Sequence, residues 1–263
     1  MGVLMFVQKI MLQKINNDIE NDTEEIIANF ICSLKNNGQI LRDHITVRNN
    51  QDYDIYVTAP KCNSLENRYD SIYVKRDRDL LSKYFTINIC QIGIDVDSQE
   101  YCSCEKRTAI EMQTFANDID SVFTCCSCGK PIALYELPYI EKQDDHWCVV
   151  NWQHTFGATD ELWLCCLSDR FTGNQLTNVN SALNKSGREI AEKISQKTGI
   201  KFYYNVFDDL TKKVKFTKVN GRAVRICPSC GKAMNYVKLG NDYERYICND
   251  CNLSSDLPKD DPL

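Results

Sequence analysis

The hydrophobic residues of the first hundred positions recur with spacings that predict alternating strands and helices. Apolar residues dominate 3–14, as in a strand, and recur at helical spacing after the capping sequence at 22–25 until an Asn-Gly pair stops the helix. The expected elements are a strand at 3–14, a helix at 23–37, strands at 40–47 and 54–58, a helix at 65–84 and a strand at 85–92. This β-α-β-β-α-β order predicts a ferredoxin-like domain over residues 1–95 of an α+β protein.

Beyond position 95 the pattern is less regular and predicts a second α+β region over 96–210. Apolar residues around Trp152 indicate a helix. We expect Gly157 to end this helix and Asp160 to open a strand, because glycine commonly follows the last turn of a helix.

The helix with the clearest boundaries is expected at 186–199. Ser186 and Glu189 have the spacing of a capping box, and Gly199 follows the last apolar position. A strand at 201–207 and a hairpin turning at Asn220-Gly221 come next. Residues 211–263 are therefore expected to form a small C-terminal domain built on hairpins.

Four cysteines of this C-terminal region have the spacing of a zinc ribbon. The metal ligands expected here are Cys227, Cys230, Cys248 and Cys251. Each Cys-x-x-Cys pair places two sulfurs on one side of a tight turn, and two such turns complete a tetrahedral shell. Four protein ligands leave no open position for water, so we expect structural rather than catalytic Zn²⁺.

A second Cys-x-x-Cys pair, Cys125 and Cys128, lacks an obvious second half. The pair is either a turn rich in small thiols or half of a second metal site. Ligands that would complete such a site are Cys102 with Cys104, Cys165 with Cys166, or His146 with Cys148. A thioredoxin-like motif requires the second cysteine in a helix, whereas Pro131 and Pro138 here indicate extended chain.

The composition is that of an ordinary globular protein, with 43% hydrophobic and 25% charged residues. The opening apolar run is too short and too interrupted for a signal peptide or a membrane span, so a cytoplasmic protein without membrane contact is expected. Fifteen cysteines in such a compartment are mainly free thiols or metal ligands. Only three histidines and no nucleotide-binding or hydrolase motif are present, which predicts a protein without catalytic activity.

The C-terminal half resembles a bacterial family of uncharacterised proteins described as zinc-ribbon-containing candidates for nucleic-acid binding. The matching segments are CxxCGKPIALYELP at 125–138, NWQ at 151–153, NKSGREIAEKISQKTGIKFYY at 184–204, CPSCG at 227–231 and CNDCNLSSDL at 248–257. The resemblance implies that the four ribbon cysteines bind zinc and that Cys125 and Cys128 form a further knuckle. Because such proteins occur beside antibacterial toxins, it also suggests an immunity role.

The charge distribution separates two binding functions. Residues 1–184 carry 16 Lys and Arg against 26 Asp and Glu, whereas 185–247 carry 14 against 6. The favoured hypothesis is a protein partner, such as a toxin domain, that meets an acidic surface with the candidates Asp95, Asp97, Asp118 and Asp120. The alternative is nucleic acid held by the basic segment, with the candidates Lys213, Lys215, Lys218, Arg222 and Arg225. A zinc-dependent or thiol-redox enzyme is the least favoured of the three.

Overall fold

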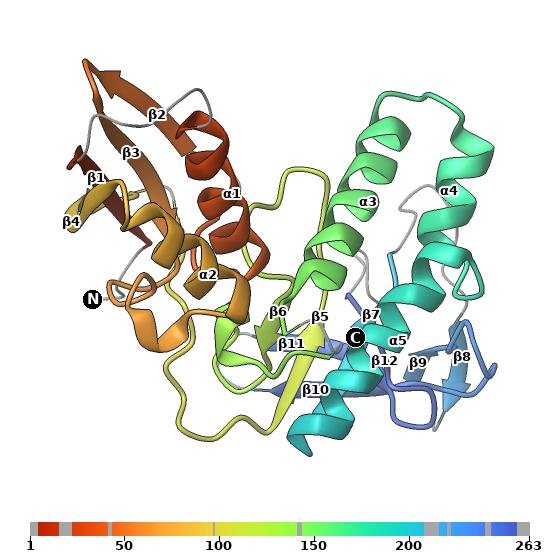
Figure 1. Cartoon of the computed structure of the whole chain (residues 1–263). Helices are drawn as coiled ribbons and strands as arrows, with labels where there is room; N and C mark the ends of the chain where they lie inside the picture. Colours follow the sequence, from red (N-terminus) through yellow and green to blue (C-terminus); the bar gives the residue numbers. More distant parts are fainter. Residues whose placement is uncertain are drawn as a thin grey trace. The chain divides into compact units, whose positions relative to one another are not determined.

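The structure, a computed structural model of the whole chain (Figure 1), forms two compact units. The residues it describes are 5–15, 23–41, 44–96, 98–140, 144–207, 216–219, 222–239 and 243–256. The first unit comprises residues 1–101 together with 119–121 and 131–147. The second comprises the remaining segments, 102–118, 122–130 and 148–263. The chain therefore passes between the units several times.

The first unit contains a four-stranded antiparallel sheet with the strand order β2-β3-β1-β4. Its elements are β1 (Phe6–Lys14), α1 (Thr23–Asn36), β2 (His44–Asn49), β3 (Asp52–Ala59), the short 3₁₀ helix η1 (Asn67–Tyr69), α2 (Ile72–Leu81) and β4 (Phe85–Ile94). The β-α-β-β-α-β order expected from the sequence is confirmed. In this order β3 lies between β1 and β2, as in a split β-α-β arrangement.

The core of the first unit follows from the period-two alternation of its strands. Ile10 and Leu12 of β1 are fully buried, and they pair with Ile55 and Tyr53 of β3. The same cluster contains Phe30 and other apolar residues of α1. Burying a side chain of this size contributes about 1.5–3 kcal/mol, so this layer accounts for much of the stability of the unit.

Residues 131–147 complete the first unit although they are distant from it in sequence. They include the 3₁₀ helix η2 (Leu134–Glu136). Ala133 and Tyr135 form a buried cluster with Met5 and Tyr101. Gly38, which ends α1 with φ +72°, fits tightly here because a Cβ at this position would lie 2.5 Å from the Cβ of Leu134.

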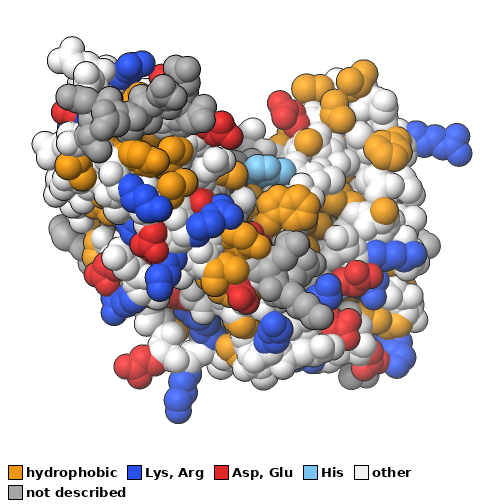
Figure 2. All heavy atoms as spheres, in the orientation of Figure 1, with side chains coloured by type: hydrophobic (Ala, Val, Ile, Leu, Met, Phe, Trp, Pro, Cys, Tyr) orange, Lys and Arg blue, Asp and Glu red, His pale blue; other side chains and the backbone are white. Residues whose placement is uncertain are grey.

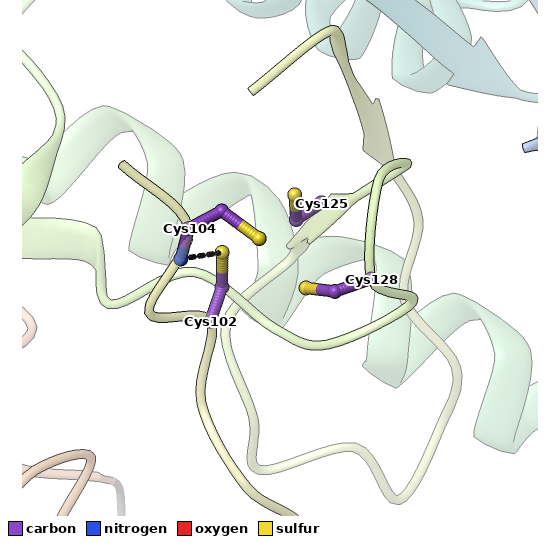
Figure 3. Close-up of side chains that lie close together, drawn as sticks. All are labelled: Cys102, Cys104, Cys125 and Cys128. Carbon is purple, nitrogen blue, oxygen red and sulfur yellow. Dashed lines mark hydrogen bonds between the residues drawn. The ribbon is translucent and has the colours of Figure 1, made fainter. Parts of the chain in front are cut away.

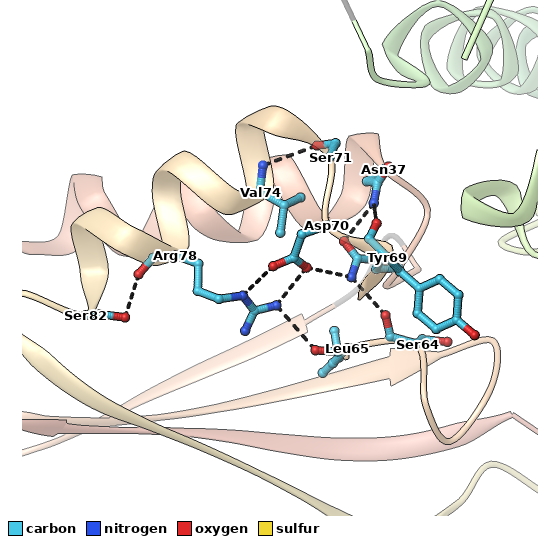
Figure 4. Close-up of polar contacts among 10 residues, drawn as sticks. Asn37, Ser64, Leu65, Tyr69, Asp70, Ser71, Val74, Arg78 and Ser82 are labelled. Atoms are coloured by element: carbon cyan, nitrogen blue, oxygen red, sulfur yellow. Dashed lines mark hydrogen bonds and ion pairs between the residues drawn. The ribbon is translucent and has the colours of Figure 1, made fainter. Parts of the chain in front are cut away.

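A buried polar network fixes the loop that precedes α2 (Figure 4). Arg78 donates two hydrogen bonds to the Asp70 carboxylate, at 2.6 and 2.9 Å, and a third to the carbonyl of Leu65. Gln39 donates to Asp70 at 3.1 Å. The Ser71 side chain accepts from the backbone N–H of Val74 and caps the helix. The network satisfies polar groups that would otherwise be costly to bury.

The second unit contains a six-stranded mixed sheet with the strand order β10-β11-β12-β7-β5-β6. Its strands are β5 (Ala109–Met112), β6 (Phe123–Cys125), β7 (Lys201–Asn205), β10 (Asn235–Leu239), β11 (Tyr243–Cys248) and β12 (Leu253–Ser255). β7 runs parallel to both β5 and β12. Strands from the predicted middle region and from the predicted ribbon thus share one sheet. A separate hairpin, β8 (Phe216–Val219) and β9 (Arg222–Arg225), agrees with the predicted hairpin.

The helices of this part of the chain are α3 (Trp147–Leu164), α4 (Asp169–Thr177) and α5 (Ala182–Thr198). The prediction that Gly157 ends a helix and that Asp160 opens a strand is wrong, because α3 continues through both. A Cβ at Gly157 would lie 3.4 Å from the carbonyl oxygen of Ala116, and the Asp160 carboxylate accepts the N–H of that residue at 2.8 Å. Both residues therefore serve a tertiary contact with the chain near Ala116.

The start of α5 also differs from the prediction. The helix begins four residues earlier than Ser186, and its N-cap is Ser181, whose side chain accepts from the N–H of Asn184. The predicted end at Gly199 is confirmed, with φ +68°. Among the described residues no helix is long and apolar enough to cross a membrane.

Candidate metal centres

The four cysteines predicted to form a zinc ribbon lie together in the second unit. Their sulfur atoms are all within 4.8 Å of one another, and we call Cys227, Cys230, Cys248 and Cys251 the ribbon cluster. The sulfurs of Cys230 and Cys248 are 3.7 Å apart. A tetrahedron with metal–sulfur bonds of about 2.3 Å has edges of about 3.8 Å, so the spacing fits Zn²⁺.

The first knuckle of the ribbon cluster is held by backbone hydrogen bonds. The N–H of Cys227 donates to the carbonyl of Lys232 at 2.8 Å, and the N–H of Gly231 donates to the carbonyl of Cys227 at 3.0 Å. Gly231 has φ +73°, a conformation in which side chains are strained. The second knuckle follows β11, and the Lys232 ammonium pairs with Asp250 beside it at 2.6 Å.

A second group of four cysteines lies by β6, at the other edge of the same sheet, and Figure 3 shows their side chains close together. Its members, called here the hairpin cluster, are Cys102, Cys104, Cys125 and Cys128, again with all sulfurs within 4.8 Å. Of the three ligand pairs considered from the sequence, the structure thus brings Cys102 and Cys104 to this knuckle.

The two clusters use the same local structure. Both contain the sequence Cys-x-Ser-Cys-Gly-Lys, at 125–130 and 227–232. In the hairpin cluster the N–H of Cys125 donates to the carbonyl of Lys130 at 2.9 Å, and the N–H of Gly129 donates to the carbonyl of Cys125 at 2.8 Å. Gly129 has φ +72°. The repeat of sequence, hydrogen bonds and torsion angle indicates that both turns could hold a metal ion in the same way.

The other candidate ligands are not part of either cluster. Cys165 and Cys166 are exposed after α3. His146 is completely buried in the first unit, where its ring lies 4.7 Å from that of Tyr139, and burial lowers its pKa to about 3. Because Cys128 lies in a turn rather than in a helix, its position also differs from that of the second cysteine of a thioredoxin motif.

Crowding of the thiols shifts their pKa values in opposite directions. A hydrogen bond from Cys125 lowers the pKa of Cys102, with further help from Arg107, and the same bond together with burial raises the pKa of Cys125. In the ribbon cluster the backbone of Lys232 lowers the pKa of Cys230, whereas burial raises that of Cys248. Four such thiols can all become thiolates only beside a cation, so the donor set fits a divalent soft metal.

The clusters differ in exposure and in their place in the sheet. Cys102 and Cys125 are fully buried, whereas Cys230 is exposed. The hairpin cluster lies at the end of β6, one edge strand of the sheet. The ribbon cluster joins the loops around β10, β11 and β12 at the opposite edge. A metal ion in each would therefore hold both margins of the sheet.

We expect the purified protein to contain two zinc ions per chain. Cys128→Ser and Cys251→Ser should each reduce the content to one, because each removes one ligand from a different cluster. Cys166→Ser, outside both clusters, should leave it at two. Elemental analysis after gentle purification measures the content. A content of one zinc ion in the wild type would show that one of the two clusters holds no zinc. A metal-free protein would show this for both clusters.

The acidic candidates for partner binding have mixed surroundings. Asp95 is partly exposed, and Asp97 lies outside the described residues. The Asp118 carboxylate accepts from the N–H of Phe115 at 2.8 Å. Asp120 accepts from the hydroxyl of Tyr101 and from Gln99, and burial raises its pKa. Asp118 and Asp120 thus have local structural roles, and their use by a partner stays a prediction.

The basic candidates for nucleic-acid binding are only partly described. Lys213 and Lys215 lie outside the described residues, and the backbones of Lys218 and Arg222 lie in β8 and β9. Arg225 is 4% exposed and donates to the carbonyl of Asp256 at 3.1 Å. Arg225 is therefore part of the interior rather than of an open basic surface.

The chain is similar to proteins of unknown function. Residues 104–207 match the family model of a domain of unknown function (DUF2310), and residues 5–89 match that of another (DUF8589). One uncharacterised protein of Haemophilus influenzae is 26% identical over 132 residues, which is 48% of this chain and 60% of that protein. A second is 24% identical over 260 residues, or 94% and 95% of the two chains. The resemblance found in the sequence thus holds at the level of uncharacterised bacterial proteins.

A solved structure with some likeness is the solution structure of a hypothetical Arabidopsis thaliana protein. It covers 37% of this chain and 96% of its own, with 7% identity and a TM-score of 0.29. A likeness this weak supports no inference about fold or function.

Proposed function

We propose that this protein is a non-catalytic, zinc-stabilised binding protein whose partner is another protein, such as the toxin domain that an immunity protein neutralises. In this proposal the first unit is a ferredoxin-like domain, and the two cysteine clusters hold structural Zn²⁺ in the second. Each cluster supplies four sulfur ligands, which leaves no position at the metal for water or substrate. The metal would then shape a binding surface rather than perform chemistry.

The observation that carries the proposal is an apolar patch at the junction of α3 and α4. Four large side chains are exposed there, and we call them the apolar tip: Leu162 at 42%, Leu164 at 58%, Leu167 at 57% and Phe171 at 63%. Figure 2 shows hydrophobic side chains gathered in this region of the second unit, at the upper right. Several large apolar side chains exposed on one short segment are typical of protein interaction sites, because their burial against a partner is favourable.

The chain around the apolar tip has an unusual conformation. Cys166 and Ser168 have positive φ angles of 54° and 57°. Residues other than glycine, asparagine and aspartate rarely adopt this backbone conformation. The turn therefore stores strain of order 1–3 kcal/mol per residue. Such strain at a turn that presents exposed leucines supports a role in binding rather than in folding.

Pairing of the basic residues in the ribbon favours a protein over nucleic acid. Lys232 pairs with Asp250, and Lys238 pairs with Glu244 at 3.0 Å. Arg245 lies 3.3 Å from the buried carboxylate of Glu111 and 3.1 Å from that of Asp256. These cations are already matched by carboxylates of the same unit, so a phosphate backbone would have to displace them.

The proposal is tested with a purified antibacterial toxin domain as the candidate partner. Leu164→Asp combined with Phe171→Asp should weaken its binding at least ~30-fold, since removing two central apolar contacts costs about 2 kcal/mol or more. Ile72→Asp, an equally exposed isoleucine on α2, is the matched control and should bind as the wild type. Calorimetry measures affinity, and growth of cells that express the toxin measures protection.

Two results would contradict the proposal. One is wild-type affinity and protection in the double variant. The other is micromolar or tighter binding of single-stranded or duplex nucleic acid at physiological salt that Lys213→Glu with Lys215→Glu abolishes. The second result would establish the alternative function, nucleic-acid binding. Phosphate contacts of this kind contribute to the affinity for nucleic acid of any base sequence, and they weaken steeply with salt.

A further inference from the structure

Strand β4 forms an edge of the first unit's sheet and contains no charged residue. Its ten residues, FTINICQIGI at 85–94, also contain no proline. Among the described residues only β1 pairs with it, so its other edge presents backbone N–H and C=O groups. Natural sheets usually protect such edges with charges, prolines or a covering segment, because an open edge invites another strand to pair.

The exposure of β4 agrees with an open edge. Ile89, Ile92 and Ile94 are 38%, 51% and 49% exposed. The opposite edge of the sheet, β2, is shorter and carries Arg48, which pairs with Glu24 at 3.2 Å. Only one of the two edges therefore lacks the usual charged protection.

We propose that β4 pairs antiparallel with β4 of a second copy of this chain, which would join two four-stranded sheets into one of eight strands. A two-fold axis brings each strand against itself, so a charge at or next to the axis would lie close to the same charge of the second copy. The absence of charge from all ten residues removes this repulsion. The nearest charge on the neighbouring strand, Lys9, is neutralised by Asp54 at 3.0 Å.

The register of β1 with β4 locates the regular part of the edge. Pairing is continuous from Lys14–Phe85 to Gln8–Gln91, and the irregularity follows at Val7. An axis at Asn88, the centre of 85–91, places Ile87 opposite Ile89 of the second copy. Ile87 and Ile89 lie opposite the buried Leu12 and Ile10, on the side of the helices. The dimer would thus continue the hydrophobic layer of each unit across the axis.

Sedimentation of the full-length, zinc-loaded protein tests the proposal. The wild type should be a dimer at tens of micromolar, and Ile89→Lys should be a monomer because each lysine would face Ile87 of the other copy, with the two lysines diagonal to each other across the axis. Ile45→Lys, on the opposite edge strand and at a position 65% exposed, is the matched control and should remain a dimer. Amide exchange of 85–91 should be slower at high than at low protein concentration in the wild type alone.

Asn88→Lys provides a second variant should Ile89→Lys fail to fold, as judged by circular dichroism and zinc content. Asn88 is exposed, and its side chain makes one long, exposed hydrogen bond within the chain, to Gln13 at 3.5 Å, so its replacement should disturb the fold little. A monomeric wild type at 100 micromolar, as an order of magnitude for weak pairing, would overturn the proposal. So would a dimer that survives both Ile89→Lys and Asn88→Lys.

Discussion

Replacing Cys125 with serine is expected to unfold much of the second unit, whereas the same change at Cys165 leaves it folded. Cys125 is fully buried at the end of β6, and its sulfur is one of four that surround the proposed metal. Serine is a poor zinc ligand, so the metal is lost and three thiols remain crowded in the interior. Since the binding free energy of structural zinc is also folding free energy, the loss has a ceiling on the order of 10–16 kcal/mol.

Three measurements check this expectation. Zinc content should fall by one per chain, the thermal transition of the second unit should move to much lower temperature, and proteases should cut within 102–130. Cys165 is exposed and belongs to neither cluster, so Cys165→Ser controls for the loss of a thiol. An unchanged transition in Cys125→Ser would show that the hairpin cluster does not hold a structural metal.

Gly187→Ala should destabilise the protein although alanine is the better helix former. A Cβ at Gly187, in the middle of α5, would lie 2.4 Å from Tyr204 and 2.8 Å from Trp152. Both rings are fixed, because the Tyr204 hydroxyl donates to Asn184 at 2.6 Å and the Trp152 ring N–H donates to the carbonyl of Leu183 at 3.1 Å. Overpacking of this kind costs about 1–3 kcal/mol or more.

Gly173→Ala is the matched control for this prediction. Gly173 also lies within a helix, but a Cβ there would meet Trp163 at an ordinary 3.6 Å. Its replacement should stabilise by up to about 1 kcal/mol through helix propensity alone. Thermal unfolding should therefore shift in opposite directions for the two variants. If both variants shifted the unfolding temperature in the same direction, α5 and β7 would be able to move apart and make room for the methyl group added at Gly187.

The sequence predicted the order of helices and strands in the first unit because their signals are local, but the helix expected at 65–84 is shorter and spans Ile72–Leu81. The alternation in β1 and β3 and the helical repeat of α1 are each visible within about ten residues. The errors arose where a residue serves a distant contact. Gly157 has the appearance of a helix end, yet it allows the close approach of Ala116, which is 41 positions earlier in the sequence. A local pattern in a single sequence does not show which distant residues are in contact.

The metal sites were predicted to different degrees for a similar reason. The ribbon cluster consists of two Cys-x-x-Cys pairs, whose spacing alone identifies it. The hairpin cluster combines one such pair with Cys102-x-Cys104, a spacing that is not specific, and several other cysteines compete for the role. One further signal was available, because the Cys-x-Ser-Cys-Gly-Lys sequence of the ribbon knuckle recurs at 125–130.

The discontinuous make-up of the first unit has a consequence for synthesis of the chain. Residues 131–147 contribute Ala133 and Tyr135 to a buried cluster that also contains Met5 and Tyr101. Domains usually fold as they leave the ribosome, N-terminal part first. Here the N-terminal unit stays incomplete until residue 147 has emerged, after all four cysteines of the hairpin cluster. The growing chain thus exposes a complete set of zinc ligands before its first domain can close.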